Sequence, residues 1–501
     1  MSRITRHLLL AFYGDDFTGS TDAMESLART GLRTVLFLDA PSPVQLRRFP
    51  GLRAFGVAGT GRTMTPTQMT RELPPIFRAL RASGAPLVHY KICSTFDSSP
   101  RIGSIGKAID VAQGVFRSPF VPLLVGAPML GRYCVFGNLF ARSGLDSEPH
   151  RLDRHPTMRH HPTTPMDEAD LRLHLAKQTC KTIGLLDVVQ LESPNAAHRL
   201  SQLLDADTEI ILFDVVNDSH LPRLGQLIGS HANPRQPLFV VGSSCVEYAL
   251  AARWRQCGRL KTRPAEFSLA RTQALVVVSG SCSPVTDRQI RRAVEGGFAE
   301  IALDTAALVH PKTRSSGIAR VLNAAAALFT AQRSVIFHTA RGPQDPRLAS
   351  TQRALARLGL RSAATLGTLL GELLAKVLEQ TGWTRGAVTG GDTSSFAARA
   401  LGVEALEFLA PIAPGAPLCR VQAPGHPADG REIVFKGGQN GRDDFFLSAL
   451  YGDVSSVPQA RAPSRDVSPR PPSCAALKAR TPRHRGGRSA RRETRDREQM
   501  T

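Results

Sequence analysis

Short apolar runs recur along the chain, each followed by a polar turn and a stretch with helical spacing of apolar residues. This alternation is typical of βαβ units, in which helices cover a parallel sheet. The first series of strands is predicted at residues 7–13, 34–39, 54–58, 87–93, 121–126, 210–216 and 238–241. The second series is predicted at residues 274–279, 301–303, 334–338, 387–389 and 433–435, with the clearest helix at 366–380. The pattern therefore predicts an α/β fold with mostly parallel sheets.

A polar stretch at 258–268 separates the two series and indicates a domain boundary. We expect an N-terminal α/β domain at 1–260 and a C-terminal α/β domain at 268–450. Residues 452–501 are rich in proline, arginine and serine and almost lack large apolar side chains. We therefore predict that this basic tail is disordered.

Composition excludes some classes of protein but does not select one. A hydrophobic share of 42% and a charged share of 21% are ordinary for a globular chain. No apolar run reaches the roughly 18 residues of a membrane-spanning helix, and no signal peptide is evident, so we expect a cytoplasmic protein without a membrane partner. The cysteines form no C-x-x-C pair, which favours reduced thiols. A net charge of +21 would attract nucleic acids and small anions alike.

Two adjacent carboxylates, Asp15 and Asp16, follow the first predicted strand and precede a helix expected from Ser20. The carboxyl ends of strands face the ligand crevice in doubly wound sheets. The two carboxylates could hold sugar hydroxyls, bind a metal ion or accept a proton. Alternatively, they only cap the helix that follows, and their spacing leaves both interpretations open.

A second polar turn follows the fourth predicted strand. Lys91, near the strand end, could pair with a substrate carboxylate, and Arg62, after the third strand, could reach the same group. Ser94, Thr95 and Asp97 could bond substrate hydroxyls. The alternative is an ordinary turn with solvated basic side chains.

Three turns of small residues follow strands of the second series. Free backbone N–H groups at a helix N-terminus bind anions, so these turns are predicted to be phosphate loops. The chain has no P-loop, dinucleotide fingerprint or protein-kinase signature, so a nucleotide would be held in a less common manner. The candidate residues are Ser279, Ser281, Ser283, Gly390, Gly391, Asp392, Thr393 and Gly438.

A histidine cluster at 154–162 invites a metal-binding interpretation. Its proline-containing loop lacks a matching pair of cysteines or carboxylates. We therefore expect an anion-binding or ordered loop and no metal site formed by the protein.

The motifs at 15–19 with Asp22, at 279–286 and at 389–394 resemble, in order and spacing, those of the four-carbon acid sugar kinase family. The resemblance covers about residues 7–450. It implies a sugar-acid-binding N-terminal domain, an ATP-binding C-terminal domain, and phosphorylation of the terminal hydroxyl across a ligand cleft between them, with ATP and Mg²⁺. The resemblance implies a small sugar acid such as 3-oxo-tetronate or 3-oxo-isoapionate as substrate. Stretches at 125–133 and 151–156 differ from those of ordinary tetronate kinases and resemble a subgroup acting on a branched acid such as 3-oxo-isoapionate.

The resemblance also assigns residues. The loop at 436–441 departs from the family pattern, which leaves open which glycine contacts the nucleotide. Separately, phosphoryl transfer needs an acceptor for the hydroxyl proton, and we expect Asp16 to take that role. The residues assigned to the sugar acid are Asp15, Asp16, Arg62, Lys91, Ser94, Thr95 and Asp97, and those assigned to ATP are the candidates of the three small-residue turns.

Two alternatives remain from the residues themselves: a sugar-acid dehydrogenase on an α/β scaffold, and a basic nucleic-acid-binding protein. The missing dinucleotide fingerprint counts against the first. An aromatic content of 6% and the lack of a recognised binding motif count against the second, so no nucleic acid partner is expected. The sequence leaves open whether the chain forms a homo-oligomer.

Overall fold

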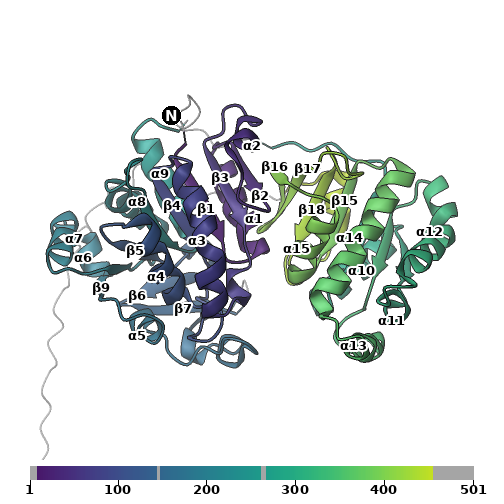
Figure 1. Ribbon diagram of the computed structural model, residues 1–501, viewed down its shortest axis with the longest axis horizontal. Helices are drawn as coiled ribbons and strands as arrows, with labels where there is room; N and C mark the ends of the chain where they lie inside the picture. Colours follow the sequence, from purple (N-terminus) through teal and green to yellow (C-terminus); the bar gives the residue numbers. More distant parts are fainter. Residues whose placement is uncertain (1–7, 144–146, 261–266, 455–501) are drawn as a thin grey trace, which may run out of the picture. The chain divides into compact units, whose positions relative to one another are not determined.

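Figure 1 shows the computed structural model, which describes residues 8–143, 147–260 and 267–454. Contacts group Met1–Val457 into one compact unit and separate it from Pro458–Thr501. Apart from its first three residues, the predicted tail at 452–501 lies outside the described residues. The domain boundaries at 260 and 268 stay predictions, because both series of strands fall within the one unit.

Eight strands of the N-terminal half pair with one another in parallel. They are β1 (Leu10–Gly14), β2 (Thr34–Phe37), β3 (Ala54–Ala58), β4 (Leu87–Lys91), β5 (Val121–Leu124), β9 (Ile183–Leu186), β10 (Ile210–Phe213) and β11 (Leu238–Gly242). In β1, Leu10 and Phe12 belong to one apolar core and Ala11 and Tyr13 to another. Burial on both faces explains why such strands appear as continuous apolar runs, although the short β9 escaped prediction.

The C-terminal half adds five parallel strands and one antiparallel hairpin. The parallel strands are β12 (Leu275–Ser279), β13 (Ala299–Ala302), β14 (Val335–His338), β15 (Arg385–Thr389) and β18 (Glu432–Lys436). The hairpin of β16 (Ala405–Ala413) and β17 (Ala416–Gln422) lies between β18 and β2. It was not predicted, because its prolines are atypical of strands.

That hairpin joins the two halves into one sheet. The order of its 15 strands is β13-β14-β12-β15-β18-β17-β16-β2-β3-β1-β4-β11-β5-β10-β9. The mostly parallel α/β fold is thus confirmed, with the difference that the two predicted sheets are continuous.

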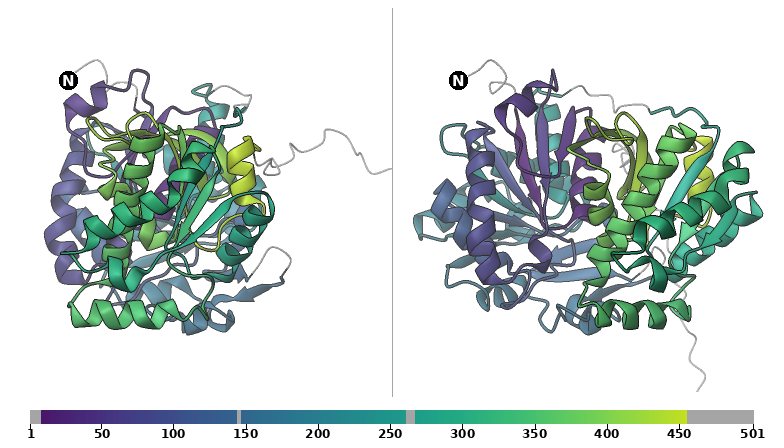
Figure 2. Two further views of the ribbon diagram at one scale, coloured as in Figure 1. Left: turned by 90° about the vertical axis from the view of Figure 1, so that its right-hand side faces the viewer. Right: turned by 45° about the vertical axis from the view of Figure 1, so that its right-hand side comes forward.

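Helices cover both faces of the sheet (Figure 2). In the described part of the chain, no helix is both long and apolar enough to cross a membrane. The helices are α1 (Phe17–Arg29), α2 (Pro43–Arg47), α3 (Pro66–Ala82), α4 (Ile105–Phe116), α5 (Leu171–Ala176), α6 (Val188–Glu192), α7 (Ala196–Asp205), α8 (Leu221–Gly229), α9 (Cys245–Gln256), α10 (Pro284–Glu295), α11 (Thr305–Leu308), α12 (Arg314–Thr330), α13 (Arg347–Arg357), α14 (Ser362–Thr381), α15 (Gly391–Ala400) and α16 (Phe445–Tyr451).

A small antiparallel sheet lies in the N-terminal half, formed by β6 (Arg132–Val135), β7 (Asn138–Arg142) and β8 (Pro149–Arg151). These strands are short and largely half-buried. They lack the continuous apolar run of a buried parallel strand, and for that reason the sequence did not predict them.

The histidine cluster forms an ordered loop. Burial lowers the pKa of His155, whose Nδ1 accepts hydrogen bonds from the backbone N–H groups of Thr157 and Met158 at 3.1 and 3.2 Å. His161 Nδ1 accepts from Thr164 N at 3.0 Å. Across the described residues, no group of three histidine, cysteine or acidic side chains could hold a metal ion. The ring nitrogens therefore stabilise turns.

Helix α1 contacts both halves of the sheet. The ring of Phe17 packs edge-to-face on Phe435, with 5.4 Å between ring centroids. Near the other end of the helix, Glu25 Oε2 accepts a hydrogen bond from Gly415 N at 3.0 Å. Burial raises the pKa of Glu25 to about 8. The position of α1 is therefore fixed from both sides.

Replacing Phe17 with alanine is expected to lower the free energy of unfolding by about 3 kcal/mol, because a buried aromatic side chain leaves a cavity. Phe136→Ala is the matched control, because that ring is 53% exposed, and a change within about 0.5 kcal/mol is expected for it. Urea denaturation measures both values. Equal losses for the two variants would contradict the role given to Phe17.

Candidate functional site

The candidate site begins where the strand order of the N-terminal half reverses. β1 lies between β3 and β4, and ligands of open α/β sheets bind at the carboxyl ends of strands at such a point. Asp15 and Asp16 follow β1, Arg62 follows β3, and Lys91 ends β4. The predicted side chains thus meet at one edge of the sheet.

Arg62 joins the two carboxylates. Its Nη2 lies 3.2 Å from Asp15 Oδ1 and 3.1 Å from Asp16 Oδ1. Burial raises the pKa of Asp15 to about 6, although Arg62 acts to lower it. The buried Nε of Arg62 has no hydrogen-bond partner among the described residues. One N–H of this guanidinium is therefore available to a ligand.

Asp16 caps α1 and yet stays accessible. Its Oδ1 accepts a hydrogen bond from Gly19 N at 2.8 Å, as the capping interpretation expected. Its side chain is 27% exposed, against 4% for Asp15. Within the described residues only Oδ1 is engaged, so Oδ2 can meet a ligand. Capping and ligand binding are therefore compatible at this position.

Lys91 is buried beside a third carboxylate, Asp22. The Lys91 Nζ lies 3.3 Å from Asp22 Oδ2 and donates to Ile92 O at 3.3 Å. Burial alone would lower the pKa of Lys91, but Asp22, Glu247 and further carboxylates raise it. A Cβ on Gly19 would lie 3.3 Å from Nζ. The charged ammonium therefore lies next to the first turn of α1.

The turn at 94–97 is largely satisfied by its own contacts. Thr95 Oγ1 donates to Asp97 Oδ1 at 2.6 Å and lies 2.9 Å from Cys93 Sγ. Thr95 and Asp97 are buried. Ser94 is half-buried and makes no side-chain hydrogen bond with the described residues. Thr95 and Asp97 therefore shape the turn, whereas the Ser94 hydroxyl is available.

The C-terminal half repeats this arrangement at β12, where the strand order reverses between β14 and β15. Gly280 N donates to Thr389 O at 3.0 Å, and Gly390 N donates to Lys436 O at 2.9 Å. These hydrogen bonds extend the ladder beyond Ser279 and the neighbouring strand ends. The three predicted small-residue turns therefore lie side by side.

The first and third of these turns pack closely. Thr286 Oγ1 lies 3.0 Å from Ser281 Oγ and 2.9 Å from Gly438 O. Ser283 Oγ accepts from Val285 N at 3.1 Å and caps α10. A Cβ on Gly438 would lie only 2.6 Å from Ser281 Oγ. The contact thus requires glycine at 438.

In the second turn, Gly390 has a backbone conformation that favours glycine. Its φ is +120°, and a Cβ there would lie 2.8 Å from Thr393 Oγ1. A Cβ on Gly391 would meet only Thr18 Oγ1, at 3.8 Å. Asp392 is exposed in the first turn of α15, whereas Thr393 is buried. Gly391 therefore borders open space in front of a helix N-terminus.

Thr18 lies between the carboxylates that follow β1 and the glycine turns of the C-terminal half. Its Oγ1 lies 3.8 Å from the Cβ position of Gly391, and its Cγ2 lies 3.7 Å from that of Gly437. Because Thr18 follows Asp16 by two positions, the carboxylate and two glycine turns border the same region. The N-termini of α1 and α15 contribute free N–H groups and partial positive charge there. Such an arrangement can hold an anion beside a polar ligand.

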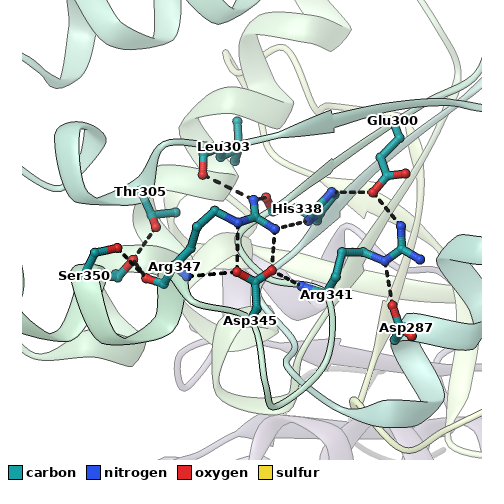
Figure 3. A network of polar contacts seen from close by, with 10 residues as sticks. Asp287, Glu300, Leu303, Thr305, His338, Arg341, Asp345, Arg347 and Ser350 are labelled. Atoms are coloured by element: carbon teal, nitrogen blue, oxygen red, sulfur yellow. Dashed lines mark hydrogen bonds and ion pairs between the residues drawn. The ribbon is translucent and has the colours of Figure 1, made fainter.

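A charged network joins α10 to the ends of β13 and β14 (Figure 3). Arg341 donates from Nε to Asp287 Oδ1 of α10 and from Nη1 to Glu300 Oε1, both at 2.6 Å. Arg341 N donates to Asp345 Oδ2 at 2.7 Å. Burial would raise the pKa of Asp345, but hydrogen bonds from Arg347 and Arg341 lower it to about 2. Asp287 and Glu300 lie 54 and 41 residues before Arg341, so no local pattern predicted these two contacts.

The structure brings most of the predicted residues together, and their roles toward ligands stay predictions. The carboxylates and basic residues meet at β1, β3 and β4, and the serines and glycines meet at β12, β15 and β18. Thr95 and Asp97 bond to each other. Sequence reasoning gave no role of their own to Thr18, Asp22 and Lys436. Thr18 and Asp22 lie close to Asp16, in the first two turns of α1.

Comparisons with known proteins agree with this division. Residues 10–250 match the family described as sugar-binding N-terminal domain, and residues 276–446 match that described as nucleotide-binding C-terminal domain. A 3-oxo-isoapionate kinase of Paraburkholderia graminis is 44% identical, over 90% of this chain and 96% of that protein. A 3-oxo-tetronate kinase of Cupriavidus necator is 31% identical, over 88% and 96%. Neither relative supports the dehydrogenase or nucleic-acid-binding alternatives.

A solved structure from Salmonella typhimurium LT2 is similar to this fold. Its TM-score is 0.72 at 25% identity, and the match covers 88% of this chain and 98% of that chain. The similarity spans both halves of the sheet.

Replacing Arg62 with methionine is expected to raise the pKa of Asp15 above about 6, because Arg62 is the main charge that lowers it. Carboxyl ¹³C NMR between pH 4 and 8 measures the titration, with the Asp15 signal assigned by its loss in Asp15→Asn. Arg101→Met, which changes an exposed arginine, should leave the titration unchanged. An unaltered Asp15 pKa in Arg62→Met would rule out that the Arg62 charge lowers the pKa of Asp15.

Proposed function

Because the chain belongs to the family of four-carbon acid sugar kinases, we propose that this ATP-dependent sugar-acid kinase phosphorylates the terminal hydroxyl of 3-oxo-isoapionate. The observation that carries the choice of acid is the higher identity to the 3-oxo-isoapionate kinase than to the 3-oxo-tetronate kinase, over nearly the whole chain. The activity belongs to carbohydrate acid catabolism.

The sugar acid binds at the carboxyl ends of β1, β3 and β4. Its carboxylate pairs with Arg62 and Lys91, and the free Nε of Arg62 supports this role. Asp16 and Ser94 bond its hydroxyls. Asp15 acts by holding Arg62, with which it pairs at 3.2 Å. Thr95 and Asp97 hold the shape of the neighbouring turn.

ATP binds at the three small-residue turns of the C-terminal half. Backbone N–H groups at the N-termini of α10 and α15 bond its phosphates, and glycine lets the backbone approach closely. The open space around Gly391, where an added Cβ would meet only Thr18 Oγ1 at 3.8 Å, supports this role. The residues concerned are Ser279, Ser281, Ser283, Gly390, Gly391, Asp392, Thr393 and Gly438.

Asp16 accepts the proton of the attacking hydroxyl. The hydroxyl oxygen forms a bond to the γ-phosphorus, the bond to the bridging oxygen breaks, and ADP leaves with the electron pair. Such transfer needs positioning and charge neutralisation more than covalent help. Two observations support this assignment. The Asp16 side chain is partly exposed, and Thr18, two residues after it, lies beside the turns of Gly391 and Gly437.

Mg²⁺ is part of the proposal. It usually keeps several waters and binds through one or two carboxylates and the substrate phosphates, so a cage of protein ligands is not required. Asp392 fits this chemistry, because it is exposed and forms no ion pair with the described residues. Bound there, Mg²⁺ would neutralise phosphate charge. A cytoplasmic location completes the proposal, and the oligomeric state is left open.

A coupled ADP-release assay tests the substrate. With ATP and Mg²⁺, 3-oxo-isoapionate is expected to give a kcat/KM about 10-fold or more above that of 3-oxo-tetronate, because a pocket shaped for a branched acid leaves unfilled space around an unbranched one. Equal values would contradict the choice of acid. No ADP release with either compound, nor with threonate or erythronate, would contradict the kinase assignment.

Asp16→Asn and Gly391→Val should separate chemistry from nucleotide binding. Asp16→Asn keeps the side chain's shape but loses the proton acceptor, so kcat should fall roughly 100-fold or more while ATP still binds. Gly391→Val places a branched side chain in the space before α15 and should weaken ATP binding. Calorimetric ATP titration of both variants is the measurement. Lost ATP binding in Asp16→Asn, or unchanged ATP binding in Gly391→Val, would contradict the assignment of proton transfer to Asp16 and of ATP binding to the turn of Gly391.

A further inference from the structure

A row of three polar side chains crosses the carboxyl ends of β12, β15 and β18. Ser279, Thr389 and Lys436 are partners in the parallel register, and all three are buried. Side chains two positions apart in a strand point to the same face of the sheet. Two positions before the row stand Val277, Ala387 and Val434, which belong to the apolar core completed by α10 and α16. The row therefore lies on the face of the sheet that α10 and α16 cover. Each member of the row is followed directly by glycine.

Lys436 in this row lacks an anionic partner. Its Nζ donates to Thr389 Oγ1 at 3.3 Å and lies 5.3 Å from the centre of the Phe445 ring. No carboxylate of the described residues forms an ion pair with it. Ser279 Oγ is also buried and has no hydrogen-bond partner among the described residues. A buried ammonium without an anion is costly, and so is an unpaired buried hydroxyl.

The charged groups on neighbouring elements do not compensate Lys436. Burial lowers the pKa of Lys436 to about 7, and no charged neighbour contributes to this shift. The other charged side chains of β15, β18, α10 and the start of α16 form ion pairs of their own, among them Arg385 with Glu432, Arg288 with Asp443, Asp287 with Arg341, and Asp444 with Arg442. Asp392 of α15 is exposed, forms no ion pair with Lys436 and does not contribute to the shift of its pKa. Lys436 therefore needs an anion that the described residues do not supply.

We infer that Lys436 is a phosphate-binding residue of the nucleotide site, and that its ammonium pairs with the phosphate chain of ATP or ADP. The inference rests on the proposed kinase function. The glycines that follow the row let backbone N–H groups approach the same phosphates. The N-terminus of α10, capped by Ser283, adds partial positive charge. Phosphate supplies the charge that the buried ammonium lacks.

Lys436→Met tests the inference in the full-length protein, because it keeps the length of the side chain and removes the charge. ADP titrated by calorimetry at pH 7 is expected to bind about 10- to 100-fold more weakly. The melting temperature at pH 6 should stay equal or rise, because an uncompensated buried charge is removed. Lys376→Met, which changes an exposed lysine of α14, should alter neither value.

Proton uptake provides a second readout. At pH 8 the free Lys436 is mostly neutral, and phosphate binding restores the ammonium, so ADP binding should take up close to one proton. Calorimetry in Tris and in HEPES measures this uptake, which Lys436→Met should abolish. ADP affinity within 2-fold of wild type in Lys436→Met, a drop of several degrees in its melting temperature, or proton uptake equal to wild type would each overturn the inference. Failure of the wild-type protein to bind ADP would instead contradict the proposed kinase function.

Discussion

The pairing of one guanidinium with two adjacent carboxylates determines the character of the N-terminal half of the site. Asp15 and Asp16 follow β1 directly, and two ionised carboxylates on adjacent residues repel each other when both lie against the same side chain. Arg62 lies 3.2 and 3.1 Å from them, while burial keeps the pKa of Asp15 near 6. Without the guanidinium, Asp15 would be protonated up to a higher pH, so Arg62 is what lets both side chains be charged at the end of a buried strand.

The same first turn of α1 determines how the two halves meet. Asp16 caps the helix, Phe17 packs on Phe435, and Thr18 lies against the positions of Gly391 and Gly437. Three consecutive residues therefore cap the helix beside Arg62, pack the two halves together and border two glycine turns of the C-terminal half. A change in the direction of α1 would alter all three contacts together.

Strands and single turns were predictable because their signals are local. Burial on both faces makes β1, β4 and β12 continuous apolar runs, and small residues after such runs indicate helix N-termini. The hairpin of β16 and β17 was not predictable, because its strands carry prolines and its pairing with β2 depends on residues far away in sequence. The network of Arg341 with Asp287 and Glu300 was missed for the same reason.

The two sides of the site differ in how their charged side chains are paired. On the sugar-acid side, carboxylates and basic residues are already paired, as in the contact of Lys91 with Asp22. On the nucleotide side, Lys436 is buried without an anion. If ATP binds there as proposed, its phosphates bring the anionic charge that this side lacks, and its γ-phosphoryl group would repel the Asp16 carboxylate. Arg62, whose Nη2 lies 3.1 Å from Asp16 Oδ1, would offset that repulsion.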